Sequence, residues 1–263
     1  MDTIDLHSVN PWELSFLRHE VGGYFSHGVE LAPGATVLDV GANIGVFSAA
    51  VYERLDGDVR IYAFEPLPPL YETLDRNARE FFDGRLTALP YGLAERDEEL
   101  DFSYFPAATI FSSSWRGEDT VEAERQRVTA SMVEAIRQGG LGPVLRRVPA
   151  PVLRGLVSRK LRVLRNLETH RVLVRPLSAV FDERDIGHVD LLKVDVEGAE
   201  LDVLRGIEDR HWPLIRQVVV EVEGWRQHRD AVREILLGRG FAVDVEQDPV
   251  QLAADIGMVF AAR

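Results

Sequence analysis

The chain of 263 residues contains no cysteine, which excludes disulfide bonds and thiolate metal sites and is compatible with a reducing compartment. It also lacks any apolar run that approaches the roughly 20 residues needed to span a bilayer. The N-terminus has Asp2 and Asp5 where a secretion signal would have basic residues. We therefore expect a soluble, cytoplasmic protein with no membrane span.

Positive charge is scarce in this sequence. There are 30 Lys and Arg against 43 Asp and Glu, giving a net charge of −13, which argues against nucleic-acid binding. The segment 143–175 is the exception, because nine basic residues there accompany a single acid, Glu168. We interpret this segment either as a solvated helix face or as a docking surface for an anionic partner, such as an acidic carrier protein.

The stretch Val37–Ser48, VLDVGANIGVFS, has only part of the glycine pattern that binds dinucleotides. A short apolar strand leads into Gly41 and Gly45 at the mouth of a helix, as in α/β folds that bind an adenosine-type cofactor. Asn43 stands where the dinucleotide pattern has its middle glycine. Asp39, two residues before Gly41, suits a ligand with an ammonium group and repels a pyrophosphate. The stretch therefore favours S-adenosylmethionine over NAD.

Apolar strands alternate with amphipathic helices along the chain, which is typical of a doubly wound α/β sheet with helices on both faces. The run Val189–Val194 is almost entirely apolar, as expected of a strand buried on both faces. The other expected strands are Thr36–Val40, Arg60–Phe64, Arg85–Leu93, a hairpin-like Glu99–Phe105, Gln217–Val222, Phe241–Val245 and Met258–Ala261, and the expected helices are Ile44–Arg54, Leu70–Phe81, Ala199–Ile207 and Asp230–Arg239.

Two regions depart from this alternation. Residues 1–30 predict a helical cap within Leu6–Gly28, with Asn10 as N-cap and Glu13 completing a capping box. Between residues 112 and 170, two amphipathic patterns, Glu118–Gln138 and Leu153–Leu167, replace the strands. We expect a single domain over 1–263, in which this insertion is either a helical lid over the carboxyl edge of the sheet or a structural hairpin.

Glu65 ends the second expected strand, 20 residues after Gly45, and is followed by Pro66. In nucleoside-binding α/β sheets, an acid at this place accepts hydrogen bonds from both ribose hydroxyls. The same spacing suits NAD, so Glu65 indicates a nucleoside without identifying the cofactor.

A second group of acids follows the strand near residue 194, in the sequence LKVDVEGAE. Asp195 ends the strand that faces the glycine turn, where it could hold the cofactor's amino group, act as a general base or bind a metal. Glu197 is a second candidate base, whereas Glu200 lies near a helix N-terminus, where an acid is favourable for electrostatic reasons alone. Glu221 and Glu223 end the next strand and could join Asp195. Asp195, Glu221 and a further oxygen ligand could hold Mg²⁺, but no spacing is diagnostic, so we predict no metal.

The seven histidines show no metal-ligand spacing. His27 and His170 flank the expected pocket, and each is a candidate base, although a lone histidine is more often structural. Ser112–Ser114 lacks the context of a nucleophile elbow, which argues against a hydrolase.

Five segments occur in a fixed order: VLDVGANIGVFS, FEPLPPLYETLDRN, YFPAATIFSSSW, LLKVDVEGAELDVLRGI and RQVVVEVEG. In these the chain resembles the FkbM-type S-adenosylmethionine-dependent methyltransferases, most strongly the members that O-methylate polyketides and related natural products. The resemblance extends from about Trp12 to Arg263. It implies the class I methyltransferase fold, a Rossmann-like sheet of seven mostly parallel strands whose last strand is antiparallel. It implies cofactor binding at Asp39, Gly41, Asn43, Gly45 and Glu65, with Gly92 beside the adenine. Ala42, Pro66 and Asp195 complete the predicted cofactor-binding set.

The chain departs from the family at the end of the fifth strand. Family members have Glu-x-His there, and this chain has Glu221-Val222-Glu223. The resemblance implies transfer of the sulfonium methyl to a hydroxyl of a small-molecule natural product, a macrolide for example. We expect Asp195 to lie beside the reacting methyl, with Glu197 or Glu223 as alternative bases. Sugars, lipids and carrier-bound intermediates are alternative acceptors, and an NAD-dependent oxidoreductase or a non-catalytic docking module is the alternative class.

Overall fold

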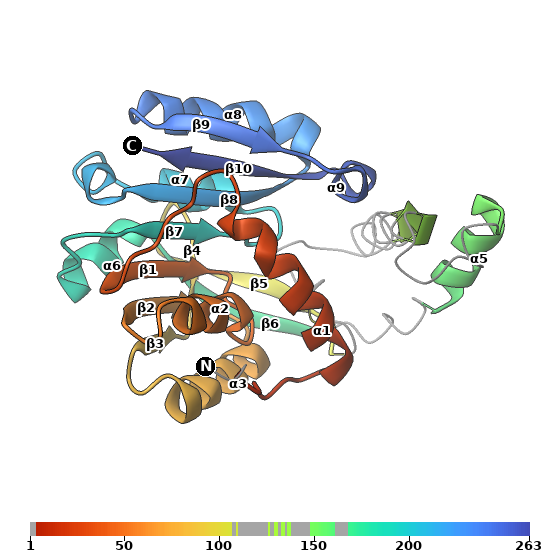
Figure 1. The fold of residues 1–263 in the computed structure, drawn as a ribbon, viewed down its shortest axis with the longest axis horizontal. Helices are drawn as coiled ribbons and strands as arrows, with labels where there is room; N and C mark the ends of the chain where they lie inside the picture. Colours follow the sequence, from red (N-terminus) through yellow and green to blue (C-terminus); the bar gives the residue numbers. More distant parts are fainter. Residues whose placement is uncertain are drawn as a thin grey trace.

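The computed structural model describes residues 4–106 and 168–263, and between them residues 148–160 and positions 109, 126, 129–130, 133–134 and 136–137. Its centre is a seven-stranded sheet in the order β3-β2-β1-β7-β8-β10-β9 (Figure 1). All neighbouring pairs are parallel except those of β10, which runs antiparallel to both β8 and β9. The strands are β1 (Ala35–Val40), β2 (Val59–Phe64), β3 (Leu86–Leu89), β7 (Leu191–Val194), β8 (Gln217–Glu223), β9 (Ala242–Glu246) and β10 (Ile256–Ala262). The expected fold class is confirmed.

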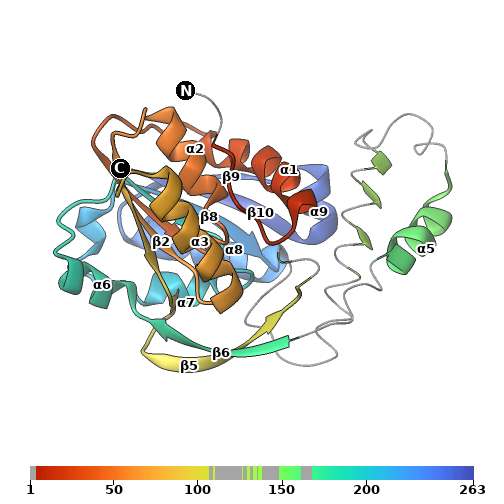
Figure 2. The same cartoon turned by 90° about the horizontal axis from the view of Figure 1, so that it is seen from below.

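Helices cover both faces of this sheet (Figure 2). Because side chains alternate along a strand, Val37 of β1 packs with one core while Leu38 and Val40 pack with the other. The first core holds η1 (Val21–Phe25), α2 (Val46–Arg54) and α3 (Pro68–Phe81), and the second holds α6 (Leu177–Arg184), α7 (Glu200–Arg205) and α8 (Trp225–Gly238). No helix within the described part of the chain is long and apolar enough to cross a bilayer.

A second, three-stranded sheet has the order β4-β6-β5, with β4 (Gly92–Leu93), β5 (Glu98–Tyr104) and β6 (Glu168–Arg175). The strand expected at Arg85–Leu93 is therefore two strands in different sheets, separated by Pro90, which cannot donate to a ladder. The hairpin expected at Glu99–Phe105 is wrong, because β5 pairs antiparallel with the distant β6. The insertion was expected to reach His170, but β6 already begins at Glu168.

The N-terminal cap consists of α1 (Pro11–Glu20) and η1, and α1 crosses the edge of the sheet at the carboxyl ends of the central strands (Figure 1). Pro11 is the first helical residue, as expected, but the predicted capping box is wrong. The side chain of Asn10 makes no capping bond and instead donates to Glu13 Oε2 and to the carbonyl oxygen of Pro106. The capping box of this chain lies at Asp248 and Gln251, in α9 (Pro249–Ala254).

Part of the insertion lies away from the main sheet (Figure 1). Its helix α5 (Ala150–Lys160) overlaps the expected helix Leu153–Leu167, whose residues 161–167 lie outside the described part of the chain. The expected Glu118–Gln138 helix is described only at scattered positions. Val133 and Ile136 from that stretch form a small apolar cluster with Leu153 and Val157 of α5. The insertion thus has a core of its own, and its role as a lid stays a prediction.

The chain turns at Gly41, where the ends of β1 and β7 approach each other closely. Gly41 has a φ of +75°, and a Cβ there would lie 1.7 Å from the backbone carbonyl oxygen of Asp195. A side chain at this position must therefore push apart two central strands and adopt a left-handed backbone conformation. The first glycine of the predicted motif is required by the fold before any ligand is considered.

We expect Gly41→Ala to lower the free energy of unfolding by about 3 kcal/mol or more, because it combines backbone strain with overpacking. Urea denaturation of the purified variant measures this loss. Gly187→Ala is the matched control, since Gly187 is exposed and no described atom lies within 4 Å of an added methyl group. Equal unfolding midpoints for the two variants would contradict the close approach of β1 and β7.

Candidate active site

The glycine turn is held by backbone hydrogen bonds from its neighbour strand. The N–H groups of Gly41 and Ala42 both donate to the carbonyl oxygen of Phe64, at 3.1 and 2.9 Å. Asn43 has a φ of +51°, and Gly45, at +92°, caps the N-terminus of α2. The turn thus lies at the carboxyl ends of β1 and β2, where sheets of this type bind ligands.

Glu65 follows β2 and is buried beside this turn. Its Oε2 accepts a hydrogen bond from the backbone N–H of Asn43 at 2.9 Å, and its Oε1 accepts one from Leu67 at 3.0 Å. Burial raises the pKa of Glu65 to about 8, and the two backbone hydrogen bonds offset only part of that effect. Additional hydrogen-bond donors, such as ribose hydroxyls, would stabilise the ionised form further.

Asn43 contributes a second polar group to the same place. Its Oδ1 is buried and has no hydrogen-bond partner among the described residues. Leaving such an atom unsatisfied costs about 1–3 kcal/mol, so its presence indicates a missing donor. Pro66 and Gly92 also meet here, because a Cβ on Gly92 would lie 3.4 Å from Pro66 Cγ. The structure brings the predicted residues Asn43, Glu65, Pro66 and Gly92 together.

Asp39 is completely buried, and its carboxylate already has partners within the protein. Its Oδ2 accepts a 2.6 Å hydrogen bond from Ser48 Oγ, and its Oδ1 lies 3.2 Å from Lys193 Nζ. The ammonium group beside Asp39 in this structure therefore belongs to Lys193. Direct contact between Asp39 and a cofactor stays a prediction, whereas its contact with Lys193 is observed.

Lys193 is a residue of this candidate site that the sequence analysis did not predict. It is 3% exposed, and its ammonium group donates to the carbonyl oxygen of Gly41 at 2.8 Å and lies 3.3 Å from Asp195 Oδ2. Although burial alone lowers the pKa of Lys193, the charges of Asp195 and Asp39 raise it above its ordinary value. Lys193 is therefore a permanent cation between two carboxylates. A lysine inside an apolar strand was the available signal.

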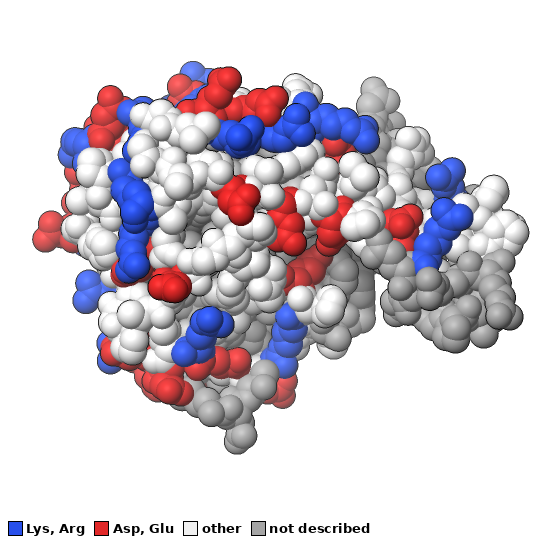
Figure 3. Space-filling model, turned by 45° about the horizontal axis from the view of Figure 1, so that its top comes forward, with Lys and Arg blue, Asp and Glu red and all other residues white. Residues whose placement is uncertain are grey.

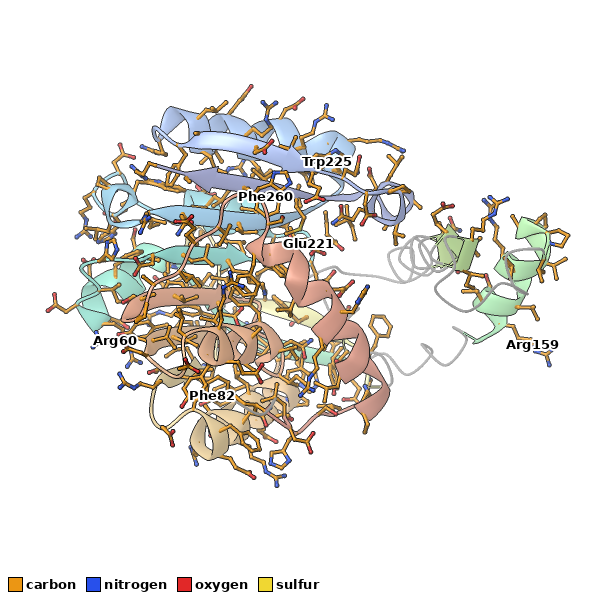
Figure 4. The ribbon with its side chains drawn as sticks, in the orientation of Figure 1. Arg60, Phe82, Arg159, Glu221, Trp225 and Phe260 are labelled. Carbon is orange, nitrogen blue, oxygen red and sulfur yellow. The ribbon has the colours of Figure 1, made fainter. Side chains whose placement is uncertain are left out.

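Tyr24, from η1 of the cap, links the next two carboxylates. Its hydroxyl lies 2.9 Å from Asp195 Oδ2 and 3.0 Å from Glu221 Oε2. Glu221 comes from β8 and lies beside the C-terminal end of α1 (Figure 4). Asp195 remains 27% exposed, so it is a side chain of this group that a ligand can reach.

Negative charge exceeds positive charge around this group. Burial, together with the charges of Asp195 and Glu20, raises the pKa of Glu221 well above its usual value. Burial and the charge of Glu223 likewise raise the pKa of Glu200 to about 8. Acidic side chains also occupy the middle of the surface in Figure 3, with basic side chains around them. A site of this composition favours a cationic ligand.

The other predicted acids lie nearby in the fold. Glu197 is partly exposed in the turn after β7, with a φ of +55°, and Glu223 is buried at the end of β8. Glu200 Oε1 accepts a hydrogen bond from the backbone of Gly198. Within the described ranges, no group of three or more histidine or acidic side chains has the arrangement of a metal site. The Mg²⁺ alternative at Asp195 and Glu221 therefore gains no support.

The two candidate histidines have structural partners. His27 ties the cap to β9 through Asp244 and Glu246, at 2.6 and 3.0 Å, and stacks on Phe260. The hydrogen bond to Asp244 raises the pKa of His27. His170 packs edge-on against Tyr104 in the second sheet. Neither histidine contacts Asp195 in this structure, and Ser112–Ser114 lies outside the described residues.

Residues 39–243 match the family described as the methyltransferase FkbM domain. Among curated proteins, the chain is 36% identical to the 31-O-demethyl-FK506 methyltransferase FkbM of Streptomyces tacrolimicus, over 97% of this chain and 92% of that protein. It is 30% identical to the methyltransferase sdnD of Sordaria araneosa, over 100% and 94% of the two chains.

The chain is also 32% identical to the AMB antimetabolite synthetase AmbE of Pseudomonas aeruginosa, over 91% of this chain but only 11% of that protein. A solved structure, methyltransferase FkbM from Methylobacillus flagellatus, superimposes with a TM-score of 0.51 at 16% identity, over 89% of this chain and 45% of that one. The structural likeness supports the fold, and the sequence matches establish the family. The chain belongs to the FkbM methyltransferase family.

Proposed function

We propose that this methyltransferase uses S-adenosylmethionine to methylate a hydroxyl group of a small-molecule natural product. The observation that carries the proposal is the placement of Glu65 and Asp195 on either side of the glycine turn. Glu65 supplies a carboxylate suited to a ribose, and Asp195 supplies a reachable carboxylate in an acidic surrounding. The family match argues against an NAD-dependent oxidoreductase, because the matching family is described as a methyltransferase domain.

The residues present fit this cofactor. Glu65 would hold the ribose hydroxyls, and the unpartnered Asn43 Oδ1 would accept a further hydrogen bond. Pro66 and Gly92 would flank the adenine, while Gly41, Ala42 and Gly45 shape the turn. The ionised Asp195 would provide negative charge that a sulfonium needs. When bound, the cofactor supplies an activated methyl group on that sulfonium.

Asp195 is the proposed base for the acceptor. Its side-chain contacts among the described residues, to Tyr24 and Lys193, both use Oδ2. Oδ1 is therefore the oxygen that would accept the proton that the acceptor hydroxyl loses when the bound cofactor supplies the methyl group. A positioned base contributes roughly 10²–10⁴-fold in rate. Glu197 and Glu223 stay alternative bases.

The acceptor class rests on the relatives. The name of the Streptomyces relative gives its substrate as 31-O-demethyl-FK506, and AmbE is named as a synthetase of an antimetabolite. These names favour a hydroxylated natural product over a sugar or a lipid. Mass spectrometry of candidate metabolites incubated with cofactor labelled in its methyl group would identify the acceptor.

Helix α5 favours a carrier-bound form of this acceptor. Residues 148–160 contain three basic residues and no acid, and Val152 and Leu156, one helical turn apart, expose large apolar side chains. Arg154 is exposed on the same helix. Arg159 projects from the same helix (Figure 4). An acidic carrier protein would complement both the charge and the apolar surface. Arg162, another basic residue of this segment, lies outside the described residues.

We expect Arg154→Glu combined with Arg159→Glu to reduce methylation of a carrier-bound acceptor about tenfold at low salt, because both reversals repel an acidic carrier. The free acceptor should be methylated at the wild-type rate. Arg76→Glu, on the exposed face of α3, is the control. Rates that are independent of both salt and these reversals would rule out carrier docking at α5.

Glu65→Ala should weaken the binding of S-adenosylhomocysteine by about 10–100-fold, since it removes hydrogen bonds to a charged acceptor. Isothermal titration calorimetry measures the dissociation constant. Glu72→Ala, exposed on α3, should bind as the wild type does.

The pH dependence of this affinity provides a second readout. Glu65 and Glu200 have pKa values raised to about 8, and a ligand that prefers their ionised forms releases protons on binding. Wild-type affinity for S-adenosylmethionine should therefore increase from pH 6 to pH 8, by up to about tenfold per unit for each proton released. Glu65→Ala should flatten this increase, and equal slopes would contradict ionisation of Glu65 on binding.

Asp195→Asn should abolish turnover while the binding of S-adenosylhomocysteine stays within about threefold of wild type, because the amide keeps the shape but cannot accept the proton. Turnover is measured with the acceptor from the mass-spectrometric screen. Asp202→Asn, exposed on α7, is the control. Near-normal turnover of the Asp195 variant would move the base to Glu197 or Glu223.

A further inference from the structure

The hydroxyl of Tyr24 lies within hydrogen-bond distance of two carboxylates. Its oxygen is 2.9 Å from Asp195 Oδ2 and 3.0 Å from Glu221 Oε2. A tyrosine hydroxyl has one proton, so it can donate to only one of them. If both carboxyl groups were ionised, one carboxylate oxygen would lie close to the Tyr24 oxygen with no proton between them, and their lone pairs would repel. The geometry therefore requires a second proton among these three groups.

The surroundings decide which carboxyl group has this proton. Lys193 Nζ lies 3.3 Å from Asp195 Oδ2, so Asp195 is stabilised as an anion. In the described part of the chain, no lysine, arginine or histidine pairs with Glu221. Glu221 instead faces the anionic Asp195, the acidic side chains of Glu20 and Glu223, and the Tyr24 hydroxyl. The less favourable place for a negative charge is thus Glu221.

We propose that Glu221 is a neutral carboxylic acid that donates to the Tyr24 hydroxyl, and that Tyr24 in turn donates to Asp195. In this directed chain, Tyr24 and Glu221 are positioning residues for Asp195, the proposed base. Oδ2 of Asp195 is saturated by Tyr24 and Lys193, which leaves Oδ1 for the acceptor hydroxyl. The inference rests on the proposed function for the role of Asp195, but not for the position of the proton.

The hydrogen-bond chain from Glu221 through Tyr24 to Asp195 also connects the cap to the sheet. Tyr24 belongs to η1, Asp195 follows β7 and Glu221 lies in β8. If the hydrogen bonds ran in the opposite direction, Asp195 would be protonated and could not accept the proton of the acceptor. The neutral state of Glu221 therefore fixes both the orientation of Asp195 and its protonation before the acceptor arrives.

Infrared difference spectroscopy tests the proton directly and needs no acceptor. At pH 7, the wild type minus Glu221→Gln should show the C=O stretch of a protonated carboxylic acid, with a shift in D₂O. The matched comparison, wild type minus Glu72→Gln, should show no such band, because Glu72 is exposed on α3. Absence of the band from the Glu221 difference spectrum would show that Glu221 is ionised and would overturn the proposal.

Tyr24→Phe tests the role of this hydrogen-bond chain in catalysis. Loss of the donor to Asp195 should lower kcat about tenfold or more and move the acid limb of the kcat profile up by about one pH unit, because a hydrogen bond to the anion is lost. Tyr52→Phe is the matched control, since Tyr52 is also a buried tyrosine that donates to an aspartate, Asp83, outside the site. Its profile should match the wild type.

The two arms separate the possible failures. An unshifted acid limb in folded Tyr24→Phe would overturn the positioning role, even if kcat fell. If that variant does not fold, the infrared spectrum of Glu221→Gln still decides the position of the proton. If the wild-type enzyme neither bound S-adenosylhomocysteine nor transferred a methyl group, the proposed function would be contradicted. The infrared spectrum would still decide whether Glu221 is protonated.

Discussion

The buried ammonium of Lys193 between Asp39 and Asp195 is the interaction on which the rest of the site depends. It joins the adjacent central strands β1 and β7 through the two carboxylates and the carbonyl oxygens of Val40 and Gly41. Removal of one partner from a buried pair costs about 3–5 kcal/mol, because an uncompensated charge remains. The glycine turn, the proposed base Asp195 and the cap residue Tyr24 all contact the ammonium group of Lys193, so their positions are set together.

The excess of carboxylates around Lys193 has a chemical consequence. Lys193 pairs with Asp39 and Asp195, whereas burial and neighbouring acids raise the pKa values of Glu221 and Glu200. The neutral forms of these two acids are therefore favoured in the free protein, in agreement with the proposed hydrogen-bond chain from Glu221 to Asp195. The excess of acidic side chains favours a cationic ligand over an anionic one.

The sequence predicted the parts of the structure that follow from hydrophobic period and strand ends. The strands β1, β2, β7 and β8 were expected, and Glu65 and Asp195 lie where those strands end. Strand β6 was missed because its partner β5 is over 60 residues away and its alternating pattern adjoins helical residues. Lys193 was missed because its charge is explained only by two carboxylates on the neighbouring strand end and the following turn, which no local pattern shows. Tyr24 was missed for a similar reason, because only the tertiary packing of the cap brings it to Asp195 and Glu221.

The second sheet is where the insertion joins the rest of the fold. Tyr104 of β5 pairs with Glu168 of β6, so the segment 105–167 leaves and re-enters the fold at adjacent points. Asn10 Nδ2 donates to the carbonyl oxygen of Pro106 at 2.9 Å and Thr109 Oγ1 donates to Glu13 Oε2 at 2.8 Å, which places the start of this segment beside α1. Because the glycine turn and Lys193 belong to the other sheet, we expect sequence changes within 105–167 to leave the buried charges of Lys193, Asp39 and Asp195 in place.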